Sequence, residues 1–545
     1  MSALLGMGIA LVPSLAAALP GGLQPRPTAI LIPLDDRPST CLFPQQIARI
    51  GGGRLRVPPR PLLGRAWTPG DPEGLAVWAR HTAPGVERAL ISADMLAYGG
   101  LVASRTAEST TEQAVRRLDL LDVLREAGTP VVAFAILPRL SLRTSEAQAP
   151  YERALANWAA SGVDSPPQNV PAGIFEEYLA VRRRNLEVLQ ALIHKVAEGN
   201  LEFLVLGQDD AASRGPHIDE QKNLEELIHR LGLERRVRIV SGADELAMNL
   251  VAGWLAGREG VQPILEVLYS EDGAGERIPP LESRPLDETL GEHLALSGAR
   301  PGTGQGTVLL VEVPSAKPYE PPALHVGPED QQRAAAFKER LDEVRASGRR
   351  VAVADLRLIN RADPVLAREL LEHLPLWELE AYAAWNTPSN ALGTAVAQAV
   401  VREVARVRGK DWSLERVLES EKTQQAFTLA RLVDDFAYQA VIRPTLSQAV
   451  RGLPRDPDPL LNLYGPVGIQ ARIEAVAWTR QVWEQRLAGR RYWVPALRRW
   501  VEFRGMHLEV VLPWPRVFEI EARLDLRLAP RDGAPPALSR TGPSS

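Results

Sequence analysis

Residues 203–220 read FLVLGQDDAASRGPHIDE. The apolar run 203–206 predicts a buried strand, and the stretch 223–228 after it predicts a helix. The polar residues between and beside them are Asp209, Asp210, His217 and Glu220. In open α/β sheets and in barrels, ligands bind where a strand ends and leads into a helix. The stretch therefore predicts an α/β fold with a site at this edge, although Asp and Gly are also ordinary turn residues in a solvated loop.

The same alternation of short apolar runs and longer amphipathic stretches continues to about residue 405. The runs that predict strands are 28–34, 88–92, 131–137, 203–206, 237–240, 264–268, 308–313, 351–354 and 380–384. The stretches that predict helices include 112–127, 174–197, 221–231, 243–257, 329–346 and 389–407. Strands that alternate with helices indicate a parallel sheet or barrel, and near-continuous apolar strands indicate a sheet covered on both faces. We predict parallel sheets of Rossmann-like βα units, with a modified TIM-like barrel as the alternative.

The length of 545 residues exceeds what one hydrophobic core usually supports, so several domains are expected. After residue 405 helical patterns replace the strand signals, and strand-like alternation returns near the end. The divisions that we predict are a signal-like segment over 1–25, α/β units over 26–200 and 201–405, a mainly helical region over 406–490, a β-rich element over 491–529 and a disordered tail, rich in Pro, Gly and Ser, over 530–545. No internal repeat is visible in the sequence.

Composition excludes some classes of function. The chain is 45% hydrophobic and 24% charged, as is usual for a soluble globular protein. Its net charge of -4 comes from mixed acidic and basic residues, which does not favour nucleic-acid binding. A single cysteine, Cys41, rules out an intrachain disulfide and a thiolate zinc cage. Cys41 follows an acidic strand-end loop, so a catalytic thiol competes with the simpler interpretation, a small buried apolar residue.

The first residues resemble a secretory signal. Residues 4–12 are apolar and residues 16–18 are three alanines, although a positively charged start is missing. Pro13 breaks the stretch, which is also too short for a membrane span. We therefore expect a protein exported to the periplasm or the extracellular space, with no stable membrane insertion.

Polar side chains follow most of the predicted strands. They are Asp35, Asp36 and Arg37 after the first run, Asp94, Tyr98 and Arg105 after the second, Asp209, Asp210, His217 and Glu220 after the fourth, Asp244 and Glu245 after the fifth, and Trp385, Asn386 and Asn390 after the ninth. The carboxyl ends of parallel strands meet at one edge, so these side chains are expected to share one rim. Structural alternatives exist for some of them, since Asp244 and Asn390 suit helix N-termini and His217 suits a loop hydrogen bond.

A rim rich in carboxylates, arginines and amides suits a sugar or another polyhydroxylated ligand. Glycosidic cleavage requires two carboxyl groups that flank the bond, one of them kept protonated by its surroundings. We predict Asp94, Asp209 and Asp210 as the catalytic carboxylates and the other rim residues as substrate-binding. The sequence thus indicates a hydrolase that needs no cofactor and acts on a small-molecule or oligosaccharide substrate.

Two other functions use the same residues. Carboxylate oxygens also bind hard cations, so a hydrolase dependent on Mg, Mn or Ca is the first alternative. A glycan-binding protein without catalysis is the second. The eight histidines form no His-x-x-x-His or His-x-His cluster, so zinc is not predicted. No nucleotide-binding glycine motif follows a strand, and no Gly-x-Ser-x-Gly elbow is present.

Several of these motifs together resemble one bacterial family. The motifs lie at residues 34–38 with 43–46, 94–105, 207–210, 242–245 and 385–390. They are similar to those of the family named domain of unknown function 4127, and the likeness extends over roughly residues 28–525. Ala384 stands where a glycine is expected in that family. The resemblance implies a bacterial protein and supplies no activity.

Overall fold

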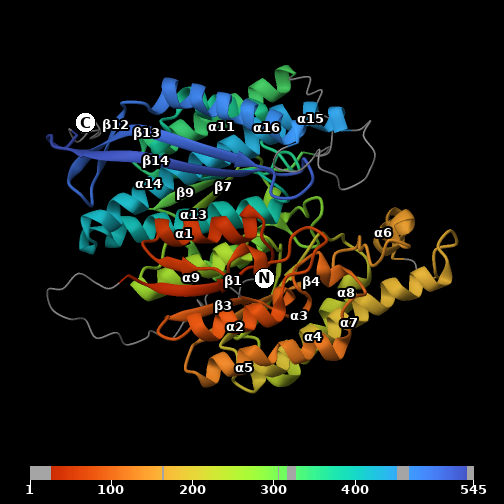
Figure 1. Cartoon of the computed structure of the whole chain (residues 1–545). Helices are drawn as coiled ribbons and strands as arrows, with labels where there is room; N and C mark the ends of the chain where they lie inside the picture. Colours follow the sequence, from red (N-terminus) through yellow and green to blue (C-terminus); the bar gives the residue numbers. More distant parts are fainter. Residues whose placement is uncertain (1–25, 163–164, 305, 316–326, 451–464, 537–545) are drawn as a thin grey trace.

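The computed structural model describes residues 26–162, 165–304, 306–315, 327–450 and 465–536. It contains two open parallel sheets, of six and five strands, and a three-stranded antiparallel sheet near the carboxyl end (Figure 1). The prediction of an α/β fold built from parallel sheets is confirmed, and the barrel alternative is wrong because neither sheet closes on itself. The predicted signal-like segment lies outside the described residues. No described helix is both long enough and apolar enough to cross a membrane.

The first sheet reverses its strand order once. In spatial order its strands are β2 (Arg54–Arg56), β1 (Thr28–Ile32), β3 (Arg88–Ser92), β4 (Val131–Leu137), β5 (Phe203–Gln208) and β6 (Val237–Ser241). All neighbouring strands are parallel. The order changes direction between β1 and β3. In doubly wound sheets such a reversal opens a crevice at the carboxyl ends of the strands.

The second sheet repeats this topology. Its strands in spatial order are β11 (Leu379–Ala383), β10 (Arg350–Asp355), β9 (Thr307–Glu312), β7 (Ile264–Tyr269) and β8 (Arg300–Pro301). When the strands are numbered from β7, they follow the order of the first five strands of the other sheet, with the reversal between β7 and β9. The two parallel sheets therefore share one topology, although no repeat is visible in the sequence.

The division between the sheets differs from the predicted division at residue 200. β5 and β6 extend the first sheet by pairing with β4 and with each other. The second sheet begins only at β7. The sequence does not mark this point, because an apolar run indicates a buried strand without indicating which sheet it joins. All nine predicted strands are present, and the two unpredicted ones, β2 and β8, are edge strands of three and two residues.

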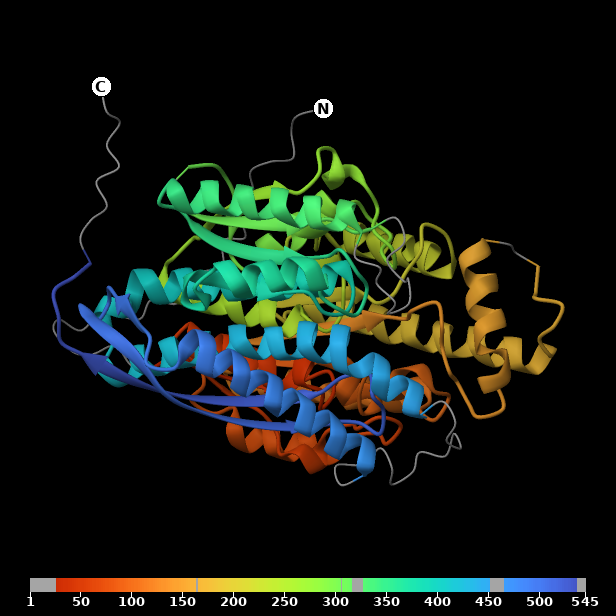
Figure 2. The same cartoon turned by 90° about the horizontal axis from the view of Figure 1, so that it is seen from above.

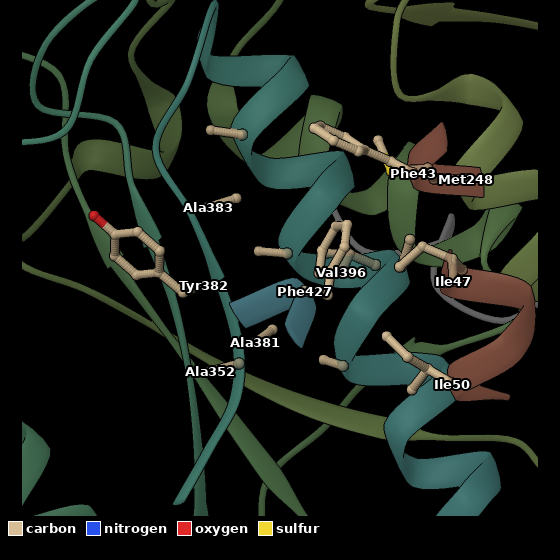
Figure 3. Packing of buried hydrophobic residues seen from close by; sticks show 14 of the residues in the cluster. Phe43, Ile47, Ile50, Met248, Ala352, Ala381, Tyr382, Ala383, Val396 and Phe427 are labelled. Carbon is tan, nitrogen blue, oxygen red and sulfur yellow. The ribbon is translucent and has the colours of Figure 1, made fainter. Parts of the chain in front are cut away.

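A layer of helices joins the two sheets. It consists of α1 (Phe43–Ile50), α9 (Leu246–Glu259) and α13 (Pro388–Arg408), which lie between the sheets in Figure 1. Figure 3 shows the apolar side chains of α1 on one side of α13 and the alanines of β11 on the other. Phe43 of α1 meets the ring of Phe427 edge-on, with centroids 5.4 Å apart. Because α13 is rich in alanine and valine, it is buried on both sides.

The other helices of the α/β part lie outside this layer. They are α2 (Pro72–Thr82), α3 (Ala93–Tyr98), α4 (Thr111–Arg117), α5 (Asp119–Glu126), α6 (Glu152–Ser161), α7 (Ala172–Ala197), α8 (Pro216–Leu231), α11 (Pro328–Ala346) and α12 (Pro364–His373). The exception is α10 (Leu286–Leu296), which packs against α9 and α13. The six predicted helical stretches are all helical, except that 112–127 is divided at Leu118 into α4 and α5.

The carboxyl-terminal part folds back over both units. Its helices are α14 (Leu414–Arg431), the π-helix η8 (Leu432–Ile442), α15 (Arg443–Val450) and α16 (Pro466–Val482). The antiparallel strands β12 (Arg491–Val494), β13 (Arg499–Val511) and β14 (Glu521–Arg531) follow, and β13 and β14 form the long ribbon of Figure 2. β14 continues past the predicted start of the tail at residue 530. The turn between β13 and β14 reaches the edge where the first sheet ends.

Close approach between α9 and the end of α10 gives a direct test of this packing. A Cβ added to Gly253 would lie 2.2 Å from the backbone oxygen of Leu296. We expect Gly253→Ala to destabilise the fold by about 1–3 kcal/mol, because the backbone of Leu296 cannot move away from the added Cβ as a flexible side chain could. The measurement is the free energy of unfolding in urea.

Gly291 supplies the matched control, since it is an exposed helical glycine with no atom within 4 Å of an added Cβ. Gly291→Ala should stabilise by roughly 0.5–1 kcal/mol through helix propensity alone. Equal effects of the two substitutions would show that α9 does not pack as described.

Candidate functional site

A cavity of about 430 Å³ lies at the carboxyl edge of the first sheet. Loops of both α/β units and the β13–β14 turn enclose it. Its lining residues are Arg37 after β1; Leu101, Val102 and Arg105 after β3; Arg139 after β4; Gln208, Asp209 and Asp210 at the end of β5; Gly242, Ala243, Asp244 and Glu245 after β6; Leu281 and Glu282 after β7; Asn360 after β10; Asn386, Thr387, Ser389 and Asn390 after β11; and Trp514, Arg516 and Phe518 in the turn. The cavity thus lies where strand-end loops converge, as the strand order requires.

Two adjacent carboxylates, Asp209 and Asp210, form one wall. The backbone N–H of Asp210 donates to Asp209 Oδ1 at 2.9 Å, which fixes the first carboxylate at the end of β5. Arg105 Nη2 contacts Asp209 Oδ2 at 2.5 Å, and Arg139 Nη2 contacts Asp210 Oδ2 at 2.5 Å. Each carboxylate therefore has its own arginine.

The surroundings shift the pKa values of this pair in opposite directions. Burial would raise the pKa of Asp209, but the charges of Arg105 and Arg139 outweigh it and hold that pKa below its usual value. Burial, together with the negative charge of Asp209, raises the pKa of Asp210 despite Arg139. Two carboxyl groups whose pKa values are pushed apart are suited to different roles in proton transfer.

A buried ion pair between Arg37 and Asp244 forms the adjoining wall. Arg37 donates through Nη1 and Nη2 to the two oxygens of Asp244, at 2.9 and 2.6 Å. Its Nε donates to Asp35 Oδ2 at 2.8 Å. This fork links the loop after β1 to the loop after β6, which are not neighbours in the sheet. Removing either partner would leave a buried charge without compensation.

Glu282, in the long connection after β7, adds a further carboxyl group. Its Oε1 accepts from the backbone N–H of Ser389 at 3.0 Å. Burial raises the pKa of Glu282 to about 8, and the nearby Asp210 acts in the same direction. Glu282 therefore carries its proton at neutral pH.

Strained backbone is concentrated at the cavity. Of the five non-glycine residues with positive φ in the described ranges, three line it: Leu281, Asn360 and Asn386, with φ values of 67°, 63° and 73°. The backbone N–H of Asn360 donates to the carbonyl of Asn386 at 2.9 Å, which ties the two strained loops together. Such conformations cost about 1–3 kcal/mol each and are commonest at functional sites.

Aromatic and arginine side chains of the β13–β14 turn close the cavity. The guanidinium of Arg516 lies 4.4 Å from the ring centroid of Trp514 and 4.9 Å from that of Phe518. Side chains of η8 hold this turn, since Tyr438 donates to the carbonyl of Val517 and Gln439 to that of Phe518, both at 2.9 Å. The carboxyl-terminal region thus completes a site built mainly by the α/β units.

Eight of the fifteen predicted site residues line the cavity: Arg37, Arg105, Asp209, Asp210, Asp244, Glu245, Asn386 and Asn390. Three more support its walls. Asp35 holds Arg37, Asp36 Oδ1 accepts from Trp514 Nε1 at 2.6 Å, and Trp385 packs against Phe518 with centroids 5.8 Å apart. Burial raises the pKa of Asp36 to about 6.

The structure places the other four elsewhere. Asp94 lies in the first turn of α3, where Oδ2 accepts from the backbone N–H of Ile136 at 2.9 Å. Burial raises its pKa to about 7. Tyr98 lies under the guanidinium of Arg184. His217 Nε2 contacts the carbonyl of Ala212 at 2.8 Å, which is the loop hydrogen bond of the alternative interpretation.

Glu220 is also outside the cavity. Its two carboxylate oxygens accept from Arg182 Nε and Nη2, at 2.7 and 2.6 Å. Arg182 in turn donates to the carbonyls of Pro138 and Arg139. Glu220 therefore positions the loop that carries Arg139, and it does not line the cavity itself.

Several lining residues that carry charged, amide or aromatic groups were not among the predicted site residues, among them Arg139, Glu282, Asn360, Arg516 and Phe518. The strand-end rule would have selected Arg139, which directly follows the third predicted strand. The other four lie in irregular segments and in a turn, where no apolar periodicity indicates position.

The described residues contain no group of three or more His, Cys, Asp or Glu side chains that could hold a metal ion. Three of the cavity carboxylates, Asp209, Asp210 and Asp244, are instead each paired with an arginine. Cys41 is buried beneath this edge, and burial raises the pKa of its thiol to about 12, which disfavours a thiolate nucleophile.

A family model described as "Protein of unknown function (DUF4127)" matches residues 29–523. No curated protein matches the sequence. Among solved structures, the chain is similar to a UDP-glucosyltransferase from Polygonum tinctorium capable of glucosylating indoxyl, with 12% sequence identity and a TM-score of 0.20. That similarity covers 85% of this chain and 99% of the glucosyltransferase.

The raised pKa of Glu282 has a consequence for stability. The folded protein keeps this proton up to about pH 8, whereas the unfolded chain releases it near 4.5. Folding is therefore favoured below about pH 4.5 by this group, and the contribution is lost as pH rises toward 8. We expect Glu282→Gln, which retains an acceptor for Ser389, to lose less stability than the wild type between pH 5 and 8, by about 1 kcal/mol per pH unit.

Urea unfolding at several pH values measures this difference. Other buried carboxyls titrate equally in both proteins and cancel. Glu226→Gln, at an exposed position on α8, is the control and should follow the wild-type curve. Parallel curves for Glu282→Gln and the wild type would contradict a protonated Glu282.

Proposed function

Because the chain belongs to the DUF4127 family of proteins of unknown function, which assigns no reaction, we propose one from the cavity: hydrolysis of a carbohydrate by a glycosidase-type acid–base mechanism. The observation that carries the proposal is the Asp209–Asp210 pair, whose pKa values are shifted in opposite directions at the cavity wall. Glycosidases need one carboxylic acid and one carboxylate at the scissile bond.

The roles follow from the two environments. Asp210, whose pKa is raised, is the better suited of the two to donate a proton to the glycosidic oxygen as the bond breaks. Asp209, held ionised by two arginines, faces the positive charge that develops on the sugar, or activates water to attack it. At Asp209 the charges of Arg105 and Arg139 outweigh burial, whereas at Asp210 burial and the negative charge of Asp209 outweigh the same two arginines.

The charge balance of the cavity favours a neutral ligand. Arg37 and Arg105 are each paired with an ionised aspartate, so neither presents an uncompensated charge to a phosphate or carboxylate. Ion-paired side chains together with the amides of Asn386 and Asn390 offer alternating donors and acceptors, which suits the adjacent hydroxyls of a sugar. A volume of 430 Å³ lies in the lower part of the range of about 300–1,000 Å³ for small-molecule sites, so a short saccharide fits better than a polymer chain.

Export to the periplasm or the extracellular space is part of the proposal. It is supported by the apolar residues 4–12 and the alanines at 16–18. Cell fractionation with antibody detection tests it. Finding the chain only with cytoplasmic markers would contradict it.

Substitution of the two carboxylates tests the reaction. The wild type is assayed against a panel of nitrophenyl glycosides, unactivated oligosaccharides and muropeptides. Asp210→Asn should reduce turnover of unactivated substrates by about 10²–10⁴-fold, because it removes the acid. It should affect nitrophenyl glycosides much less, since their leaving group needs little protonation. Asp209→Asn should reduce turnover of both.

Asp219→Asn, in the exposed first turn of α8, is the matched control and should resemble the wild type. Turnover that is abolished by chelator and restored by Mg, Mn or Ca would favour the metal-dependent alternative. Saccharide binding without any product would favour a glycan-binding protein. Turnover unchanged by Asp209→Asn would refute the assigned roles.

A further inference from the structure

Behind the cavity, a chain of buried polar side chains connects three helices. Glu245 precedes α9, Asn249 lies in α9, His293 lies in α10 with Ser297 at its end, and Asn390 lies in the first turn of α13. Glu245, Asn249, His293 and Ser297 have no exposed surface. Of these five, Glu245 and Asn390 line the cavity.

One end of this chain is fixed by a backbone carbonyl. Asn249 Nδ2 lies 2.9 Å from the oxygen of Gly393, which can only accept, and 3.0 Å from Ser297 Oγ. The amide orientation of Asn249 is thereby set, and its Oδ1 is the acceptor. Oδ1 lies 3.1 Å from His293 Nδ1, so Nδ1 carries the proton. In a neutral imidazole Nε2 is then an acceptor that needs a donor.

The other end is fixed by a backbone N–H. The N–H of Ala243 donates to Glu245 Oε2 at 3.3 Å, so Oε2 is an acceptor. Asn390 Nδ2 donates to the same oxygen at 3.3 Å. The second oxygen, Oε1, faces His293 Nε2 at 3.6 Å. Within the described ranges neither of these two buried atoms has a hydrogen-bond partner.

We propose that Ser297, Asn249, His293 and Glu245 form a relay of uncharged groups, with the proton of Glu245 on Oε1 directed at His293 Nε2, and that this relay orients Asn390 so that its Oδ1 faces the cavity and accepts a hydroxyl of the ligand. His293 and Glu245 are positioning residues in this arrangement. The hydroxylated ligand rests on the proposed function, whereas the relay does not.

The packing around Glu245 supports a defined place for an uncharged carboxyl group. A Cβ on Gly242 would lie 1.6 Å from Glu245 Oε1, and one on Gly393 would lie 2.4 Å from Glu245 Cγ. Two glycines thus leave the space that this side chain occupies. Burial raises the pKa of Glu245 well above its usual value, and the negative charge of the adjacent Asp244 acts in the same direction. Burial lowers the pKa of His293 to about 3.

The alternative state is an ion pair between ionised Glu245 and imidazolium His293, and the two states respond oppositely to one substitution. Glu245→Gln has the same shape as the neutral acid, with an NH₂ for His293 Nε2 and an oxygen for Ala243 and Asn390. In the relay we expect it to change the melting temperature by less than about 1 °C. In the ion pair it would leave a buried imidazolium without its counterion.

Asp244→Asn is the matched control at the adjacent position, because Asp244 forms a buried ion pair with Arg37. It should lower the melting temperature by about 3–4 °C. Destabilisation by Glu245→Gln as large as by Asp244→Asn would overturn the relay. ¹⁵N NMR of the imidazoles gives a second readout, with the His293 signals assigned by their loss in His293→Gln. Between pH 5 and 8 His293 Nδ1 should be protonated and Nε2 unprotonated. A doubly protonated ring would also overturn the relay.

The ligand half of the proposal is tested with D-glucose as the probe. Neutron diffraction from crystals soaked in D₂O and millimolar glucose locates the deuterium atoms of the relay and of the sugar. We expect both amide deuterons of Asn390 on the side of Glu245 and the solvent, and a glucose hydroxyl that donates to Asn390 Oδ1. Glucose bound without this contact, or not bound, would overturn the ligand half. The relay readouts are obtained without sugar, so a failure of the proposed hydrolase leaves them interpretable.

Discussion

The structure depends on compensating charges that are buried at one edge of a parallel sheet. Arg37 illustrates the constraint, because its guanidinium is almost fully buried and donates three hydrogen bonds, two to Asp244 and one to Asp35. A buried ion pair of this kind adds little net stability, since desolvation offsets most of the attraction, but breaking it is costly. The fork therefore fixes the loops after β1 and β6 in one arrangement. Asp209 and Asp210, each with its own arginine, follow the same rule on the adjoining wall.

Small residues in the helical layer bring the second unit to that edge. α13 carries alanine, glycine and valine where it meets α9 and the second sheet, so the two sheets approach closely enough for their loops to share a cavity (Figure 3). The same closeness places Asn390 beside Glu245 and Gly393 beside Asn249. Packing of the core and geometry of the cavity wall are thus consequences of one sequence feature, the small side chains of α13.

The sequence predicts the elements well and the site in part, and the reason lies in how strands lead into helices. After β5 the chain runs for seven residues before α8 begins at Pro216, so Asp209 and Asp210 remain at the edge. After β3 no such loop exists, because Ser92 ends the strand and caps α3 directly. Asp94 is consequently turned back onto β4. Periodicity locates a strand end but not the length of the loop that follows, which only the tertiary structure reveals. Glu282 and Arg516 escape prediction for a related reason, since irregular segments carry no pattern that ties them to an edge.

The two sheets share a topology but use their strand ends differently. In the second sheet the carboxylates at the ends of β9 and β10 are bound within their own unit. Glu312 pairs with Arg333, which also pairs with Asp363, and both oxygens of Asp355 accept from backbone N–H groups of Arg357 and Asp363. These side chains stabilise their loops and leave little polarity for a ligand. In the first sheet the arginines that pair with Asp209 and Asp210 come from other strand-end loops, so these pairs join separate loops at the cavity wall. The repeated framework therefore yields a ligand cavity at one sheet because its ion pairs span loops, and a closed network at the other because its ion pairs remain local.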